Sequence, residues 1–264
     1  GATNSVYSYV PVDDDIITCV LTSNAICPTG NPATSNAVVM TVNPLKPVSI
    51  TILASETTVC AGTAVNFTAA PVNGGTLPVY QWNKGGVPIS GATGVTYSYI
   101  PVNGDVITCQ LTSNAICPVG NPALSNSVTM TVNPLKPVSI TIIASETTVC
   151  AGTTVTYTAT PVNGGTAPQY QWKKNGSNIF GATNSVYSYV PVDDDIITCV
   201  LTSNAICPTG NPATSNPIVM TVNPLKPVSV TILASETTVC AGTAVDFTAT
   251  PVNGGTLPVY QWNK

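Results

Sequence analysis

The sequence predicts an all-β fold of tandem β-sandwich repeats with a period of 90 residues. The segment GATNSVYSYVPVDDDIITC begins at Gly1 and again at Gly181, and a variant of it begins at Gly91. Residues 1–84 and 181–264 differ at only five positions. No segment keeps a helical period, whereas short apolar runs alternate with turn residues along the whole chain. Repetition and strand-like patterning therefore point to the same architecture.

Each repeat divides into short strands separated by turns. In residues 47–136 the turns are marked by Asn-Gly-Gly, Gly-Gly and Asn-Gly-Asp, which favour tight reversals. The expected strands are Val48–Ala54, Ala64–Ala70, Val79–Lys84, Val95–Ile100, Val106–Thr112 and Val128–Val132. This number and spacing of strands predicts an immunoglobulin-like β-sandwich.

The octapeptide VNPLKPVS joins the repeats, and it occupies positions 42–49, 132–139 and 222–229. Its two prolines fix backbone angles and predict a short, semi-rigid connector. Two complete domains are then expected, residues 47–136 and 137–226. Residues 1–46 form the C-terminal half of a repeat, and residues 227–264 form the N-terminal half of another. Each half has bare strand edges, so we expect neighbouring sequence or another chain to complete it.

The composition excludes several classes of function. Only 7% of the residues are charged, the seven basic residues are all Lys, and His is absent. With a net charge of −4 and no basic patch, no nucleic-acid partner is expected. The lack of His removes Ser-His and Cys-His chemistry and most zinc sites, so we expect neither an enzyme nor a cofactor. No apolar run reaches the roughly 18 residues of a membrane helix, and no membrane span is predicted in this segment.

Three segments carry a family resemblance. GTAVNFTA at 62–69 resembles the second strand of an immunoglobulin domain, YQWNK at 80–84 resembles the third, and DVITCQL at 105–111 resembles the sixth. The resemblance places Trp82 and Trp172 in the domain cores. As a whole, the repeat is similar to the Ig-like and PKD-like repeats of very large surface and secreted proteins of Bacteroidota, often exported by the type IX route. The resemblance covers the whole chain and implies an extracellular or cell-surface stalk, adhesin segment or fibre unit.

The sixth-strand cysteine departs from the immunoglobulin pattern. In that family it pairs with a cysteine of the second strand, but here the partner position holds Ala69. We therefore expect Cys109 and Cys199 to be buried thiols that pack near Trp82 and Trp172 as small hydrophobes.

The other cysteines favour disulfide bonds over metal binding, because they recur in every repeat without a CxxC pair or a His. Cys60 precedes the second strand and Cys117 follows the sixth. These positions lie at opposite poles of a sandwich roughly 23 Å long, whereas a disulfide needs Cα atoms within about 7 Å. In a head-to-tail array the Cys60 pole of one domain meets the Cys207 pole of the next. The sequence therefore favours a Cys60–Cys207 bond between domains, with Cys60–Cys117 and Cys150–Cys207 bonds within domains as the alternative.

Two acidic triplets are weak candidates for calcium ligands, since calcium prefers oxygen ligands. The triplets are Asp13, Asp14, Asp15 and Asp193, Asp194, Asp195. The intervening copy keeps only Asp105, and no second ligand cluster accompanies either triplet. We expect a solvated turn before the sixth strand, and no metal.

The Asn-Gly-Gly loop at 73–75 and the Cys-Pro-x-Gly-Asn-Pro loop at 117–122 are expected at one pole. Equivalent antibody loops bind ligand, but in a tandem array this pole faces the preceding domain, so joint packing is expected. The sequence predicts a non-catalytic structural segment of a long extracellular filament, fibre or surface stalk. Its expected partners are neighbouring repeats of the same array and, in a filament, other copies of the chain. The alternative is an adhesin whose repeats bind glycan or another cell surface directly.

Overall fold

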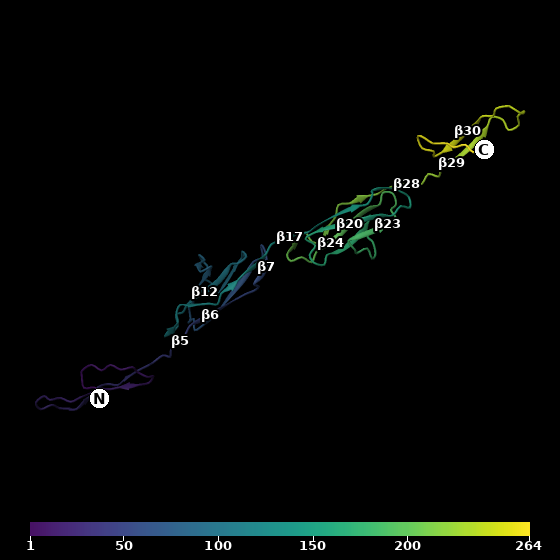
Figure 1. The fold of residues 1–264 in the computed structure, drawn as a ribbon. Helices are drawn as coiled ribbons and strands as arrows, with labels where there is room; N and C mark the ends of the chain where they lie inside the picture. Colours follow the sequence, from purple (N-terminus) through teal and green to yellow (C-terminus); the bar gives the residue numbers. More distant parts are fainter. The chain divides into compact units, whose positions relative to one another are not determined.

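The structure is a computed structural model that describes residues 1–264. Its contacts divide the chain into two compact units, Gly1–Pro134 and Leu135–Lys264. Both consist of strands and turns without any helix (Figure 1). Accordingly, no helix of this chain could cross a membrane. The prediction of an all-β chain is confirmed.

A two-sheet sandwich occupies most of the first unit. One sheet is antiparallel in the order β11–β8–β6, formed by β6 (Ser49–Ala54), β8 (Val65–Val72) and β11 (Thr96–Tyr99). The other has the order β10–β9–β12, and two short strands pair with β12 at different points along it. Its strands are β9 (Val79–Lys84), β10 (Val87–Pro88), β12 (Val106–Thr112), β14 (Ala123–Leu124) and β15 (Val128–Thr129). This arrangement is that of an immunoglobulin-like sandwich.

Two short parallel pairs lie outside these sheets. At one, β7 (Thr58–Cys60) pairs with β16 (Thr131–Asn133). At the other, β5 (Lys46–Pro47) pairs with β13 (Pro118–Val119). Each pair includes linker residues, Lys46 and Pro47 in one and Val132 and Asn133 in the other, so the two pairs attach the linkers to the sandwich.

The core of the first sandwich follows from the alternation of its strands. Val65, Phe67 and Ala69 point inward from β8 while the residues between them are exposed. On the facing sheet, Trp82 of β9 is in register with Cys109 of the neighbouring strand β12, and both are fully buried. Each fully buried large apolar side chain stabilises the fold by about 1.5–3 kcal/mol.

The second unit contains a sandwich of the same topology. Its strands are β17 (Lys136–Pro137), β18 (Ser139–Ala144), β19 (Thr148–Cys150), β20 (Val155–Val162), β21 (Gln169–Lys174), β22 (Ser177–Asn178), β23 (Val186–Tyr189), β24 (Ile196–Thr202), β25 (Pro208–Thr209), β26 (Ala213–Thr214), β27 (Ile218–Val219) and β28 (Thr221–Asn223). One sheet has the order β18–β20–β23, and the other has β22–β21–β24–β26 with β27 also on β24. Trp172 and Cys199 again meet in the core, fully buried.

The two end segments contain fewer strand pairs. Near the start, β1 (Ile16–Ile17) pairs with β4 (Val38–Val39), and β2 (Val20–Leu21) pairs with β3 (Ala33–Thr34). Near the end, β29 (Ser229–Ala234) pairs with β30 (Phe247–Val252). Their apolar faces are open: Ile232 is 62% exposed, whereas its counterpart Ile142 is 3% exposed. The assignment of residues 1–46 and 227–264 as halves of repeats stays a prediction.

The bounds of the predicted strands lie within two residues of those in the structure, except at one place. Val79–Lys84 and Val106–Thr112 have the predicted bounds. The run Val128–Val132, expected as one strand, is two, because the Met130 N–H and C=O bond with Asp105 and Gly104 while β15 and β16 pair with different strands. The two cores lie within residues 48–132 and 138–222. The domain bounds 47–136 and 137–226 stay a prediction.

Candidate functional site

The most elaborate polar structure of each sandwich is the pole where the linker enters, here called the linker pole. In the first sandwich, the Lys46 N–H donates to the Cys117 carbonyl at 2.9 Å, and the Val48 N–H donates to the Val119 carbonyl at 2.8 Å. These bonds form the parallel β5–β13 pair. The loop after the sixth strand therefore holds the linker in an extended conformation.

Asn73 of the Asn-Gly-Gly loop holds the same linker from a second side. Its side-chain amide donates to the Pro47 carbonyl at 2.6 Å. Its own carbonyl accepts a hydrogen bond from the Ser113 hydroxyl, also at 2.6 Å. Asn73 has a φ of 54°, a left-handed conformation that Asn tolerates better than most residues. The loop at 73–75 thus joins the linker to the end of β12.

The long loop is itself fixed by a reciprocal pair of hydrogen bonds. The Ser113 N–H donates to the Asn121 side-chain oxygen at 2.8 Å, and the Asn121 amide donates to the Ser113 carbonyl at 2.8 Å. A cis peptide bond joins Asn121 to Pro122. Asn121 therefore closes the loop into a compact unit in front of the linker.

The second sandwich repeats these contacts at its own linker. The Lys136 N–H donates to the Cys207 carbonyl at 2.9 Å, and the Val138 N–H donates to the Thr209 carbonyl at 2.8 Å. The Asn163 amide donates to the Pro137 carbonyl at 2.6 Å. The sequence predicts both loops at one pole, but it does not identify Asn73 and Asn163 as residues that hydrogen-bond to the linker. Their signal was present as the Asn-Gly-Gly and Asn-Pro motifs.

The opposite end of the first sandwich carries Cys60. This residue ends β7 and lies beside Asn133, and the next amide, Ala61 N–H, donates to the Asn133 carbonyl at 2.9 Å. Cys60 and Cys207 are both disulfide-bonded. The other seven cysteines are free thiols, and they are Cys19, Cys27, Cys109, Cys117, Cys150, Cys199 and Cys240. Because Cys117 and Cys150 are free, neither intradomain bond is present in this structure.

Two of the free cysteines belong to the cores of the sandwiches. Cys109 and Cys199 are free and fully buried. Burial raises the pKa of each thiol to about 11. At neutral pH both are protonated, so they act as core side chains and not as nucleophiles.

The third Asp of each acidic triplet orders a turn. Asp195 is 3% exposed and accepts hydrogen bonds from the Tyr189 hydroxyl at 3.0 Å and the Val192 N–H at 3.0 Å. Burial alone would raise the pKa of Asp195. The net effect is a lowered pKa, because the carboxylate is stabilised by four partners: the Val192 N–H, the Tyr189 hydroxyl, the Asn175 amide and the Lys174 ammonium. Asp105 makes the equivalent bonds to Tyr99 and Val102 in the first sandwich.

The other triplet members lie nearby with separate roles. The Asp13 and Asp193 side chains accept hydrogen bonds from the N–H groups of Val42 and Val222. Asp194 has a φ of 62°. No three His, Cys, Asp or Glu residues of the chain come together as a metal-binding group. The calcium assignment stays an untested prediction.

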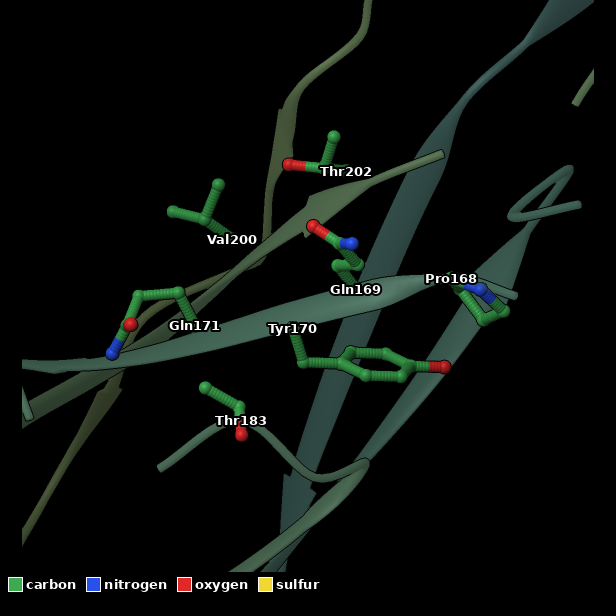
Figure 2. A pocket seen from close by; sticks show the side chains of 7 residues that line it. All are labelled: Pro168, Gln169, Tyr170, Gln171, Thr183, Val200 and Thr202. Carbon is green, nitrogen blue, oxygen red and sulfur yellow. The ribbon is translucent and has the colours of Figure 1, made fainter. Parts of the chain in front are cut away.

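A surface hollow of about 470 Å³ lies against β21 in the second sandwich (Figure 2). Its lining is uncharged and consists of Pro168, Gln169, Tyr170, Gln171, Thr183, Val200 and Thr202. In Figure 2, Gln169, Val200 and Thr202 lie on one side of the strand, and Tyr170 and Thr183 lie on the other. The Gln171 amide is held by the carbonyls of Trp172 and Ile179 at 2.9 Å each. The first sandwich has Val79 and Gln110 where this one has Gln169 and Val200.

Comparison with known proteins gives one curated relative and several solved structures that match part of the chain. No protein-family model matches the chain. The chain is 32% identical over 169 residues to the highly immunogenic outer capsid protein of Enterobacteria phage T4, covering 60% of this chain and 44% of that protein. It therefore spans less than half of the length of this relative.

Two solved structures match part of this chain. The three N-terminal domains of the bacteriophage RB49 highly immunogenic outer capsid protein are 12% identical, with a TM-score of 0.29 over 80% of this chain and 72% of that chain. Murine CEACAM1b is 17% identical, with a TM-score of 0.29 over 66% of this chain and all of that chain (100%).

Proposed function

We propose that the chain is a non-catalytic structural segment that displays immunoglobulin-like sandwiches on the outside of a larger assembly. The observation that carries the proposal is the linker pole, which binds the linker with the same hydrogen bonds in both sandwiches. The loops that bind ligand in antibodies are here engaged with the chain's own linker. A pole occupied in this way suits a spacer better than a receptor.

The similarity to a phage outer capsid protein supports external display. That relative is named for its place on the outside of a capsid, and the proposal transfers only this external position. The resemblance of the repeats to bacterial surface proteins supports the same position on a cell, where neighbouring repeats or other copies of the chain would extend it as a stalk or fibre. In both settings the segment separates what it carries from the surface below.

Immunolabelling tests external display. Antibodies raised against residues 1–264 are applied to intact phage particles and intact cells of the source culture, and to the same samples after permeabilisation. We expect label on intact surfaces of one of the two, which also identifies the surface. Label that appears only after permeabilisation contradicts external display.

A second candidate function, adhesion to glycan, is favoured by the hollow on β21. Its Tyr, Gln and Thr side chains offer an aromatic face and neutral hydrogen-bonding groups, the chemistry that suits sugars. The chain is screened against an array of glycans alongside Gln169→Val, which introduces the residue of the first sandwich. The structural proposal predicts no saturable binding by either protein. Saturable binding that Gln169→Val abolishes would establish the adhesin instead.

A further inference from the structure

We propose that Asn73–Gly74 is a deamidation site that the linker holds inactive, so that detachment of the linker allows a reaction that keeps it detached. Asn163–Gly164 is the same site in the second sandwich. The reaction is the spontaneous loss of ammonia from an Asn side chain, with water as the only co-reactant. The proposal concerns the linker pole of each sandwich by itself, and it does not depend on where the chain is displayed.

The reaction balances without an oxidant or an enzyme. The Gly74 nitrogen attacks Cγ of Asn73, a new N–Cγ bond forms, and the Cγ–Nδ2 bond breaks. The departing nitrogen takes up the proton of the Gly74 amide and leaves as ammonia, and a five-membered succinimide remains. Water then opens the succinimide at either carbonyl, which gives aspartate or isoaspartate and adds one negative charge. Asn-Gly favours this reaction because glycine has no Cβ to obstruct the attack.

The linker pole fixes the groups that must move in this reaction. The Asn73 amide donates to the Pro47 carbonyl at 2.6 Å, which holds the side chain in place. The Asn73 carbonyl accepts the Ser113 hydroxyl at 2.6 Å. The next carbonyl, that of Gly74, accepts the Asn114 N–H at 3.3 Å. Reaction therefore requires that the pole first opens, and its rate should follow the population of the open form.

Burial of the glycine adds to this protection. Gly74 is buried, and a Cβ there would lie 3.2 Å from the Pro78 Cβ and 3.5 Å from the Pro71 Cβ. Gly164 is buried in the same way. A glycine enclosed between two proline side chains has little contact with the water and base that the reaction needs.

Asn103–Gly104 is an internal reference in the first sandwich. Both residues are exposed, and the Gly104 N–H donates to the Met130 carbonyl at 2.9 Å. Asn103 precedes β12, whereas Ser113 follows it, so the two Asn-Gly sites lie at opposite ends of this strand. A change that releases only the linker entering the sandwich should therefore accelerate reaction at Asn73 and not at Asn103.

The products cannot hold the linker. Aspartate has no amide N–H to donate to the Pro47 carbonyl, and a carboxylate oxygen would replace the nitrogen that now bonds to it. In isoaspartate the main chain runs through the side-chain carbons, and the carbonyl that accepts the Ser113 hydroxyl becomes a free carboxylate. The Asn73 amide can bond to the linker again after each detachment, whereas neither product can. Reaction therefore turns a reversible detachment into a permanent one.

Peptide mapping of aged protein tests the protection by the fold. The folded chain and the chain unfolded in urea are incubated in mildly alkaline buffer made with water enriched in oxygen-18, which labels every product of succinimide hydrolysis. Mass spectrometry with fragmentation assigns the label to individual asparagines. We expect label at Asn73 and Asn163 to appear at least about tenfold more slowly in the folded chain than in the unfolded chain. Equal rates in the two states would overturn the proposal.

Lys46→Pro separates release of the linker from unfolding of the sandwich. Proline removes the N–H that donates to the Cys117 carbonyl, whereas the control Lys46→Ala keeps it. Loss of this bond should raise the open population, and with it the rate at Asn73, by about two- to tenfold. The rates at Asn103 and Asn163 should stay those of the parent chain. No acceleration at Asn73, or equal acceleration at Asn103, contradicts control by the linker.

Asn73→Asp reproduces the aspartate product directly. Its effect on the linker is measured by amide exchange at Lys46 and Val48, whose N–H groups bond to the loop after β12. We expect exchange at both to accelerate about two- to tenfold. Asn103→Asp is the matched control and should leave exchange unchanged, because the second sandwich has Asp193 at this position. Unchanged exchange in Asn73→Asp would show that the product still holds the linker, which overturns the proposal.

Discussion

The Tyr189 hydroxyl donates a hydrogen bond to the Asp195 carboxylate at 3.0 Å, and this pair links the end of β23 to the start of β24. The same carboxylate caps the Val192 N–H and lies 3.8 Å from the Lys174 ammonium. Because these partners lower the pKa of Asp195, the ionised carboxylate stabilises the turn more than the protonated acid does. Its titration therefore affects folding.

Stability should fall in acid through Asp195. Its pKa is lowered in the folded state, so the stabilisation is present above the unfolded pKa of about 3.9 and is lost as the pH falls through the lower folded value. Asp195→Asn should reduce the free energy of unfolding by about 1–3 kcal/mol at pH 7 and flatten its dependence on pH below about 4. Urea unfolding from pH 7 to pH 2 measures both effects.

Asp194→Asn is the matched control, because Asn tolerates the left-handed backbone that Asp194 adopts with a φ of 62°. It should keep the profile of the parent chain. An Asp195→Asn profile as steep as that of the parent below pH 4 would disprove the role of this carboxylate.

Gly75 should be among the least replaceable residues of the linker pole. Its φ is 84°, and a Cβ there would overlap the Asn114 side chain and lie 2.7 Å from the Ala115 nitrogen. Gly62 has a φ of 86° but nothing within 4 Å of its Cβ position. Both substitutions carry the cost of a positive φ, but only Gly75→Ala also creates an overlap. Gly75→Ala should therefore lower the free energy of unfolding, measured in urea, by about 1–3 kcal/mol more than Gly62→Ala does. Equal losses of unfolding free energy in the two variants would contradict this prediction, because they would show that Asn114 can move aside at no measurable cost.

The thiols should divide into two kinetic classes. Cys109 and Cys199 are fully buried, and burial raises the pKa of each to about 11. The five other free thiols are exposed. A maleimide at pH 7 should modify the exposed five quickly and the buried pair only at the rate of unfolding. Mass spectrometry over time counts the adducts, and a sixth rapid adduct would contradict the closed cores.

The sequence predicts the long strands well because their periodicity is local. Local patterning defines the bounds of β9 and β12 to the residue, whereas the register that sets Trp82 opposite Cys109 comes from the pairing of the two strands. The two-residue pair β5–β13 has no such periodicity, since its hydrogen bonds depend on contacts between residues more than 70 positions apart. Local patterning cannot reveal contacts of this kind.

The sequence predicts the loops of the candidate site but not their contacts, because those contacts join residues that are distant in the sequence. Loop composition indicates a pole built from Asn-Gly-Gly and Cys-Pro-x-Gly-Asn-Pro. That the Asn73 amide binds the Pro47 carbonyl depends on the closure of the sandwich, which brings together residues 26 positions apart. Asn121 is similar, because its reciprocal bonds with Ser113 require the loop to fold back on the strand it leaves.

The central claim is that each linker is a fixed part of the sandwich that follows it. Amide hydrogen exchange by NMR tests this most directly, at Lys136 and Val138, with the buried Cys199 amide as a protected reference. The account predicts exchange at both linker amides at least about tenfold slower than in an unstructured peptide. In Asn163→Gly the glycine tolerates the left-handed backbone, but the hydrogen bond from the side-chain amide to the Pro137 carbonyl is lost. This variant should accelerate exchange at Lys136 and Val138 without affecting exchange at Cys199. Exchange of Lys136 and Val138 at the unstructured rate in the parent chain would contradict the account.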